Sequence, residues 1–304
     1  MPVTLDWLGC ATFRLTIDDL VVFLDAYIDR VPLAPPVGMT AAEVDRADYV
    51  LVGHAHFDHI AGAETIALNT GARVIGSNET ARVLREAGVS EAQLLPSQGG
   101  ERHRLADGVS VEVFPALHSC IWVGGSWDPG KVVLGDYGLC EDERWDPSAR
   151  AGGIGERDQD PDPTAVQQMQ DHRASTIGSN HDGGALAFLI ETPYGSIFFH
   201  DTSGSWTGVL QDVRPDFAIV AMAGRGNVDG EPIQGSLAQF VGRMASILRP
   251  PRLTLAHHDN WMPPFTHDMT NADALGPVKS ELARMAPRSE LVELSYRSGY
   301  VIFE

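Results

Sequence analysis

Three histidines and an aspartate within six positions constrain this chain more than any other feature. The segment HAHFDH spans residues 54–59, follows the apolar run YVLV at 49–52 and leads into IAGAE at 60–64. We expect a strand that ends at Gly53, a tight turn that carries the histidines, and a helix that starts after them. The imidazoles and the carboxylate would then lie at the carboxyl end of a strand, where α/β proteins usually hold their reactive groups.

The residue types in this segment are those of a metal site. Imidazole nitrogen and carboxylate oxygen are the usual ligands of zinc and its neighbours among the transition metals. His54 and His56 flank one small residue, so both side chains can reach the same ion, and Asp58 and His59 can point at a second ion. Isolated histidine pairs are common on surfaces. This longer pattern, between an apolar strand and a small-residue helix start, indicates a metal site rather than a chance cluster.

The rest of the chain predicts two strand-rich halves. Apolar, β-rich segments indicate strands at TLDWL, ATFRLTI, LVVFLDA, ARVIGS, VSVEVFPA, GALAFLIET, GSIFFHD, DFAIVAM, RLTLAHHDN, LVELSY and GYVIFE. Helices are predicted at 41–45, 78–88, 236–249 and 272–285, with Asn78 as the cap of the second and Gly88 as its stop. This order favours an α/β (α+β) fold with two mixed β-sheets flanked by helices, in a single domain over residues 1–304.

Residues 124–183 interrupt that pattern. The segment is rich in Gly, Asp and Pro and shows little apolar periodicity. Irregular stretches of this length are usually functional lids or disordered segments. Trp127, Tyr137 and Trp145 favour a packed, cap-like insertion over a disordered one.

Composition narrows the classes of function. The formal net charge of −19 argues against nucleic-acid binding, which usually needs a positive surface. We find no signal-peptide pattern at the start and no apolar run of the roughly 18 residues that span a bilayer. Cys10, Cys120 and Cys140 are odd in number, which favours reduced thiols. We expect a cytoplasmic protein with a small-molecule substrate and with no nucleic-acid or membrane partner; a homo-oligomer is left open.

The histidine segment and three later motifs resemble those of the metallo-β-lactamase superfamily. HAHFDH matches the leading motif, and His118 in FPALHSC matches the histidine of the third motif. Asp201 in GSIFFHDTSG matches the aspartate that bridges two metals, and His257 in LTLAHHDN matches the last ligand. The opening DWLGCATFRL and the ending HHDN are most similar to the lactonase-like hydrolases related to ascorbate-6-phosphate lactonase.

This resemblance implies both a fold and a ligand set. The fold would be an αββα sandwich with its site at one edge of the two sheets. The implied ligands are His54, His56 and His118 for the first metal and Asp58, His59 and His257 for the second, with Asp201 between them. Position 56 is a histidine, whereas the redox-active diiron branch resembles H-x-E-x-D-H, so hydrolysis is favoured over electron transfer.

Two divalent ions about 3.5–4 Å apart can share a hydroxide, because a metal lowers the pKa of bound water from about 15.7 to about 7. Asp58 can orient that hydroxide and is the predicted catalytic residue. Zinc is the first choice for both ions, although manganese, iron and cobalt accept the same donors. The leading hypothesis is hydrolysis of a small ester, above all a lactone. The alternatives are a phosphodiesterase or related phosphoester hydrolase of the same fold and a non-catalytic metal-binding scaffold.

Several residues near the motifs have two interpretations. His257 is favoured over His258 as the last ligand because it comes first after the strand, and His258 could then donate a hydrogen bond in the pocket. His181 and Trp261 are candidate substrate contacts; a solvated loop histidine and simple packing are the alternatives.

Other histidines and one cysteine are expected to be structural. His200 precedes Asp201 on a strand and should face away from the metals as a buried residue. Cys120 is expected to be a small buried thiol rather than a ligand. His103 and His267 are expected at the surface.

Overall fold

The N-terminal strands bury every second side chain. The computed structural model describes residues 2–120, 162–233 and 235–304. β1 (Val3–Trp7) and β2 (Phe13–Ile17) alternate buried and partly buried positions, as strands with one face on a core do. The strands of this first sheet lie in the order β17-β1-β2-β3-β4-β5-β6. The others are β3 (Leu20–Leu24), β4 (Tyr49–Leu51), β5 (Arg73–Gly76), β6 (Leu94–Pro96) and β17 (Tyr300–Phe303).

The second sheet is built from later strands, in the order β16-β15-β12-β10-β9-β8-β7. Its members are β7 (Arg102–Ala106), β8 (Val109–Pro115), β9 (Leu186–Thr192), β10 (Gly195–His200), β12 (Phe217–Ala221), β15 (Arg252–Ala256) and β16 (Glu290–Leu291). β10, β12, β15 and β16 pair in parallel, and β7 to β10 pair antiparallel. In the first sheet β17, β1, β2 and β3 pair antiparallel, and β3 to β6 pair in parallel, so both sheets are mixed, as predicted. A small sheet adds β11 (Gly204–Ser205), β13 (Asn227–Val228) and β14 (Glu231–Pro232).

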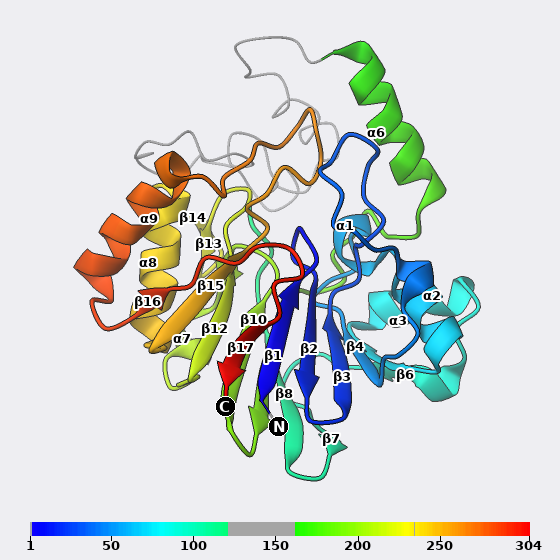
Figure 1. Cartoon of the computed structure of the whole chain (residues 1–304), viewed down its shortest axis with the longest axis horizontal. Helices are drawn as coiled ribbons and strands as arrows, with labels where there is room; N and C mark the ends of the chain where they lie inside the picture. The colour runs from blue at the N-terminus through cyan, green and yellow to red at the C-terminus, as the bar shows by residue number, and fades with distance from the viewer. Residues whose placement is uncertain (1, 121–161, 234) are drawn as a thin grey trace.

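Helices cover the outer face of each sheet, which gives the layers αββα (Figure 1). The 3₁₀ helix η1 (Ala41–Glu43), α2 (Ala63–Thr70) and α3 (Asn78–Glu86) pack on the first sheet. On the second sheet lie α7 (Thr207–Leu210), α8 (Leu237–Leu248) and α9 (Ala272–Met285). α1 (Phe57–Ile60) and η2 (Glu91–Gln93) are two further short helices. The predicted fold class is confirmed. None of the helices in the described ranges is both long and apolar enough to cross a membrane.

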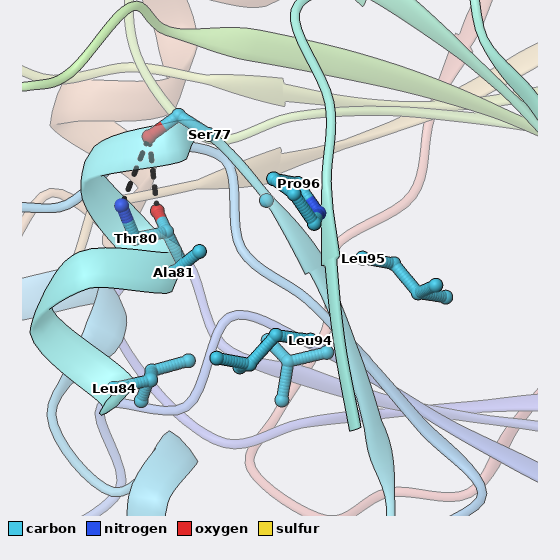
Figure 2. A pocket seen from close by; sticks show the side chains of 9 residues that line it. Ser77, Thr80, Ala81, Leu84, Leu94, Leu95 and Pro96 are labelled. Carbon is cyan, nitrogen blue, oxygen red and sulfur yellow. Dashed lines mark hydrogen bonds between the residues drawn. The ribbon is translucent and has the colours of Figure 1, made fainter. Parts of the chain in front are cut away.

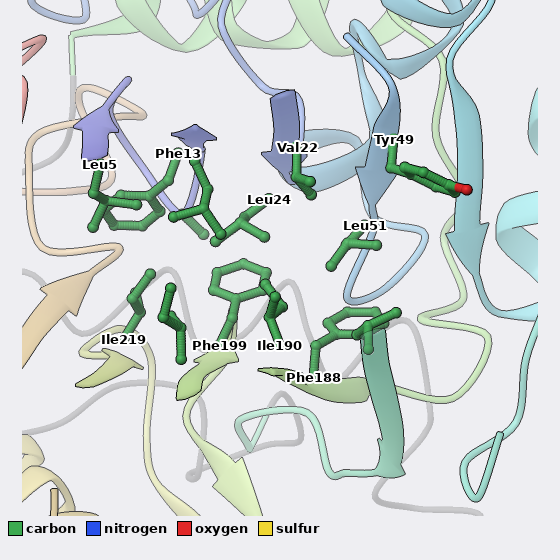
Figure 3. Packing of buried hydrophobic residues seen from close by; sticks show 14 of the residues in the cluster. Leu5, Phe13, Val22, Leu24, Tyr49, Leu51, Phe188, Ile190, Phe199 and Ile219 are labelled. Carbon is green, nitrogen blue, oxygen red and sulfur yellow. The ribbon is translucent and has the colours of Figure 1, made fainter. Parts of the chain in front are cut away.

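Large apolar side chains fill the space between the sheets. Leu5, Phe13 and Leu24 of the first sheet face Phe188 and Phe199 of the second (Figure 3). The rings of Phe13 and Phe199 meet edge-on, with centroids 6.4 Å apart. Burial of a side chain of this size contributes about 1.5–3 kcal/mol. This core fixes the two sheets face to face, and so fixes which loops meet at their edges.

The start of the helix at 78–86 differs from the prediction. Ser77, not Asn78, is the N-cap of α3: its Oγ accepts a hydrogen bond of 3.1 Å from the Thr80 N–H (Figure 2). A serine at the N-cap accepts a hydrogen bond from a backbone N–H that has no partner within the first turn of the helix. Gly88 follows the helix with a φ of 93°, as its predicted stop requires. The hollow in Figure 2 lies between α3 and β6, and none of the predicted site residues lines it.

Two other boundaries were wrong. α1 begins at Phe57, so Asp58 and His59 lie on a helical turn inside the motif rather than in a turn before the helix. In LVELSY only Leu291 belongs to a strand, the two-residue β16, and Tyr296 forms an isolated bridge to Trp7. An edge strand this short gains few ladder hydrogen bonds from its single neighbour.

Much of the predicted insertion, with its three aromatic residues and Cys140, lies in 121–161, outside the described residues. The described part begins with α6 (Pro163–Ser175), which the sequence analysis did not predict. Asp162 caps this helix by accepting a hydrogen bond of 2.9 Å from the Thr164 N–H, and Pro163 occupies the first turn. Asp-Pro-Thr is a recognisable helix start and was the overlooked signal. The role of the insertion as a cap stays a prediction.

His200 lies on the face of the second sheet that packs against the helices. It pairs with Ala187 and Val220, which belong to the apolar cluster on that face. Its side chain is fully buried, and neither ring nitrogen has a hydrogen-bond partner among the described residues. Burial lowers the pKa of His200 to about 4. It is thus a buried residue outside the inter-sheet face, as predicted.

We expect His200→Phe to stabilise the protein more at pH 5 than at pH 8. The folded pKa of about 4 lies below the ordinary value of 6.5, which applies to the unfolded chain. Between these values the unfolded imidazole holds a proton that the folded one lacks, so stability falls as the pH drops. Removing the imidazole should therefore raise the free energy of unfolding by about 2 kcal/mol at pH 5 through this protonation effect, and by almost nothing at pH 8. Urea denaturation at both pH values measures this difference.

The exposed His267 supplies the control, because its side chain is solvated in the folded and unfolded states. His267→Ala should leave the stability difference between the two pH values unchanged. If His200→Phe changed stability equally at pH 5 and pH 8, the effect would be one of packing and not of protonation.

Candidate metal centre

Four strand ends bring the predicted ligands to one edge of the two sheets. β4 leads into His54 and α1, β8 leads to His118, β10 to Asp201 and β15 to His257. This edge lies at the end of the molecule that carries α1 and α6 (Figure 1). Residues far apart in the sequence meet here because the two sheets are packed face to face.

The first cluster consists of His54, His56 and His118, whose candidate ligand atoms lie within 4.8 Å of one another. His54 Nε2 is 3.1 Å from His56 Nδ1. The ring centroid of His118 is 4.7 Å from those of both other histidines. His118 Nδ1 lies 2.8 Å from the carbonyl oxygen of Ser119, so an Nδ1–H can donate there and leave Nε2 to face the cluster. Facing nitrogens this close need a proton or a cation between them.

The second cluster consists of Asp58, His59 and His257, all of them buried. His59 Nε2 and His257 Nε2 are 3.2 Å apart, and Asp58 Oδ2 is 3.4 Å and 3.3 Å from these two nitrogens. Asp25 Oδ2 lies 2.7 Å from His59 Nδ1. A carboxylate at that nitrogen fixes the ring and its tautomer, so Nε2 is presented to the cluster.

Asp201 contacts one histidine of each cluster, at the ring nitrogen that faces away from the cluster. Its Oδ2 is 2.7 Å from His54 Nδ1 and 3.2 Å from His59 Nδ1, whereas the Nε2 atoms of these rings face the clusters. Its Oδ1 is buried and has no hydrogen-bond partner in the described part of the chain. A Cβ at Gly53 would lie 2.1 Å from Asp201 Oδ2, so only glycine admits this carboxylate at the end of β4. The carboxylate orients both rings here; its bridging role stays a prediction.

Two imidazoles of the first cluster are held in their neutral form. Burial, followed by the charges of His54 and His118, holds the pKa of His56 well below its usual range. Burial also lowers the pKa of His118 to about 3. Histidine must be neutral to bind a metal, and these two side chains meet that condition at neutral pH.

Three carboxyl groups, those of Asp25, Asp58 and Asp201, lie around His59 of the second cluster. Burial on its own would raise the pKa of Asp58, but His59 and His257 override it and hold that pKa well below its usual range. Burial and the neighbouring Asp201 raise the pKa of Asp25 to about 8. Burial would lower the pKa of His59, but the three carboxyl groups raise it well above its usual range. Within the cluster, Asp58 supplies the ionised carboxylate that a divalent cation would bind.

The spacing of the donor atoms fits metal ions. Nitrogen and oxygen ligands about 2.0–2.1 Å from a tetrahedral ion stand about 3.3–3.4 Å apart. The facing atoms of the second cluster are separated by 3.2, 3.3 and 3.4 Å. The unsatisfied Asp201 Oδ1 is a further sign that the site is built for a group besides the protein's own donors. The candidate ligand atoms of His54, His59 and Asp201 also lie within 4.8 Å of one another, and these buried donor groups fit divalent metal ions.

The predicted substrate contacts lie at different places around the clusters. Trp261 is buried and packs edge-on against His257, with ring centroids 4.6 Å apart. His258 instead stacks on Trp7, with centroids 4.7 Å apart and planes at 10°. His181 is exposed and belongs to neither cluster. Of the two adjacent histidines, it is His257 that faces Asp58.

The sequence analysis did not select two buried residues of this site. Asp25 ends the apolar strand LVVFLDA, and a carboxylate at that position was an available signal. Cys10 groups with Asp58 and His257, with candidate ligand atoms within 4.8 Å of one another. No local pattern pointed to Cys10, since these contacts span 48 and 247 positions of sequence. Burial, and then the carboxylate of Asp58, raise the pKa of the Cys10 thiol well above its usual range.

Sequence comparison relates part of the chain to known hydrolases. Residues 21–135 match a family model described as a beta-lactamase superfamily domain. A UPF0173 metal-dependent hydrolase of Pyrobaculum neutrophilum is 34% identical over 113 residues, which are 37% of this chain and 49% of that protein. The chain thus spans about half the length of the curated relatives it matches.

Structural comparison covers the whole chain. Igni18, a metallo hydrolase from Ignicoccus hospitalis, is similar with a TM-score of 0.62 and 17% identity, over 100% of this chain and 99% of that one. An isothiocyanate hydrolase from Delia radicum gut bacteria is similar with a TM-score of 0.55 and 12% identity, over 100% of both chains. At these identities the likeness concerns the fold: the chain has the metallo-β-lactamase fold, as the motifs implied.

We expect His118→Ala to lower bound metal below two ions per chain, because the first cluster would keep two of its three imidazoles. Protein loaded with zinc and desalted is analysed by elemental mass spectrometry. His103→Ala is the matched control, since His103 contacts Ser97 on another part of the fold and should leave metal content unchanged. Full metal content in the His118 variant would remove this residue from the ligand set.

Proposed function

We propose that this protein is a dinuclear metal-dependent hydrolase, with zinc as the metal, that cleaves a small ester and acts on a lactone. The adjacency of the two donor clusters carries the proposal. His54 and His59 belong to different clusters, and their ring centroids are only 3.9 Å apart. Ions held by the two clusters would be neighbours, as in two-metal hydrolytic sites. The name of the Pyrobaculum relative, a metal-dependent hydrolase, supports the same class of reaction.

Bound divalent ions would lower the pKa of a water molecule to about 7 and polarise an ester carbonyl. Asp58 is assigned to orient the attacking water, because its carboxylate is ionised, buried and directed at the cluster. Asp25 fixes the ring of His59, and Asp201 fixes that of His54. Rings held in this way cannot turn away as charge develops during the reaction.

Buried aromatic side chains pack beside the second cluster, and these apolar surroundings support a lactone as substrate. Tyr27 packs edge-on against Phe57 and Trp261, with centroids 5.6 and 6.4 Å away, and Trp261 packs against His257. The Tyr27 hydroxyl is 3.1 Å from Nε2 of His172 on α6. Apolar surroundings of this kind favour a neutral ring or acyl chain over a charged phosphodiester, and the net charge of −19 acts in the same direction.

The deciding experiment compares kcat/KM of the metal-loaded protein on a series of lactones and on bis(p-nitrophenyl) phosphate. We expect lactones to be preferred by tenfold or more, which is about 1.4 kcal/mol of transition-state discrimination. Dominant turnover of the phosphodiester would favour the phosphodiesterase alternative. No turnover of either substrate, with two ions bound, would favour a non-catalytic scaffold.

Asp58→Asn should lower kcat/KM on the preferred substrate by at least ~10²-fold, the usual effect of losing a positioned acid–base group. Metal content is measured on the same sample, because Asp58 is also a predicted ligand. Asp45→Asn is the control: Asp45 is exposed and outside both clusters, so turnover should not change. Unchanged turnover in Asp58→Asn would contradict the role assigned to this carboxylate.

A further inference from the structure

Cys10 extends the second cluster. Its Sγ lies 3.6 Å from His257 Nδ1 and 3.7 Å from His257 Nε2, and its side chain is fully buried. We propose that Cys10 Sγ is a further protein ligand of the ion held by Asp58, His59 and His257. This inference rests on the metal centre of the proposed function and adds a soft donor to it.

The distance from sulfur to nitrogen is that of two ligands on one ion. With a metal–sulfur bond of about 2.3 Å and a metal–nitrogen bond of about 2.0–2.1 Å, tetrahedral ligands stand about 3.6 Å apart. The separation of 3.7 Å between Cys10 Sγ and His257 Nε2 is close to this value; Sγ is also 3.6 Å from Nδ1, so the thiol lies against the ring and would turn toward the ion on binding. Asp58 Oδ2 lies 3.3 Å from His257 Nε2. The candidate ligand atoms of Cys10, Asp58 and His257 all lie within 4.8 Å of one another, close enough to share one ion.

The backbone of Cys10 is held in a conformation that most residues avoid. Its φ is 50°, in the left-handed region, and His257 has a φ of 63°. The His257 N–H donates to the Cys10 carbonyl oxygen at 2.8 Å, and the Trp7 indole N–H donates to the same oxygen at 3.0 Å. Strain at two contacting residues that also face the metal cluster is typical of a functional site.

Asp259 holds the backbone N–H of Cys10. The Cys10 N–H donates to both Asp259 carboxylate oxygens, at 3.1 and 3.2 Å. Asp259 in turn pairs with the buried guanidinium of Arg30 and accepts a hydrogen bond of 2.5 Å from the Tyr296 hydroxyl. The thiol is thus aimed at His257 and Asp58 by contacts from several different segments of the chain.

The position of Asp201 makes a further ligand useful. Its carboxylate lies on the Nδ1 side of His54 and His59, with which it forms a separate donor group, so it is not among the atoms that face Asp58 and His257. On binding, the S–H bond of Cys10 breaks, the proton passes to solvent, and a sulfur electron pair forms the bond to the ion. No oxidation is involved. A thiolate favours zinc, iron or cobalt over magnesium or calcium.

Cobalt provides the test. The full chain, stripped of metal, is titrated with Co²⁺, and its absorption spectrum is recorded for the wild type, Cys10→Ser and Cys120→Ser. Cys120 is the matched control, because it too is a buried cysteine but belongs to none of the donor groups in the described residues. We expect a thiolate-to-cobalt charge-transfer band in the wild type and in Cys120→Ser and its loss in Cys10→Ser, with visible d–d bands in all three.

Each other outcome has a distinct meaning. A charge-transfer band that persists in Cys10→Ser, or is absent from a wild type that shows d–d bands, would overturn the role of Cys10 and leave the metal centre standing. Failure of the wild type to bind cobalt or zinc would instead count against the proposed function. If Cys10→Ser does not fold, X-ray absorption of the zinc-loaded wild type decides: one sulfur per two zinc ions at about 2.3 Å is expected, and its absence would refute the proposal.

Discussion

Asp25, Asp58 and Asp201 place three carboxyl groups in the buried edge where the two sheets meet, and the histidines around them balance the charge of Asp58 and Asp201. A buried charge without compensation costs several kcal/mol. Two of the carboxylates are set against Nδ1 atoms, Asp25 against His59 and Asp201 against His54. Each contact fixes a ring and turns its Nε2 toward a cluster. The same contacts that manage the charge therefore also create the donor sets for divalent ions.

Three residues among or beside these polar groups have a strained backbone conformation, and the apolar core holds that backbone in place. Cys10, Asp25 and His257 adopt φ angles of 50°, 53° and 63°, each just after a strand of one of the two sheets. Left-handed conformations of this kind cost about 1–2 kcal/mol per residue outside glycine. The apolar side chains between the sheets, among them Phe13 and Phe199, hold the strands in place and so maintain these conformations at the rim.

Predictions from the sequence succeeded where the signal was local. The strands at 109–115, 186–192 and 195–200 and the helix at 237–248 were predicted from the apolar pattern of their own segments. The prediction failed for α6, where a capping pattern was overlooked in an acidic segment, and for LVELSY, whose β propensity was not matched by a neighbouring strand. Propensity describes a segment alone, whereas a strand exists only with a partner.

The sequence by itself determined the donors that share one short stretch of backbone. His54, His56, Asp58 and His59 lie on a strand end and a single helical turn, and no long-range packing is needed to bring them together. Only the tertiary structure decided that the thiol of Cys10 faces His257, 247 positions away, and that Asp201 meets His54, 147 positions away, through Nδ1. Which atom of a ring meets which partner depends on how two sheets pack, and that packing is a property of the whole chain.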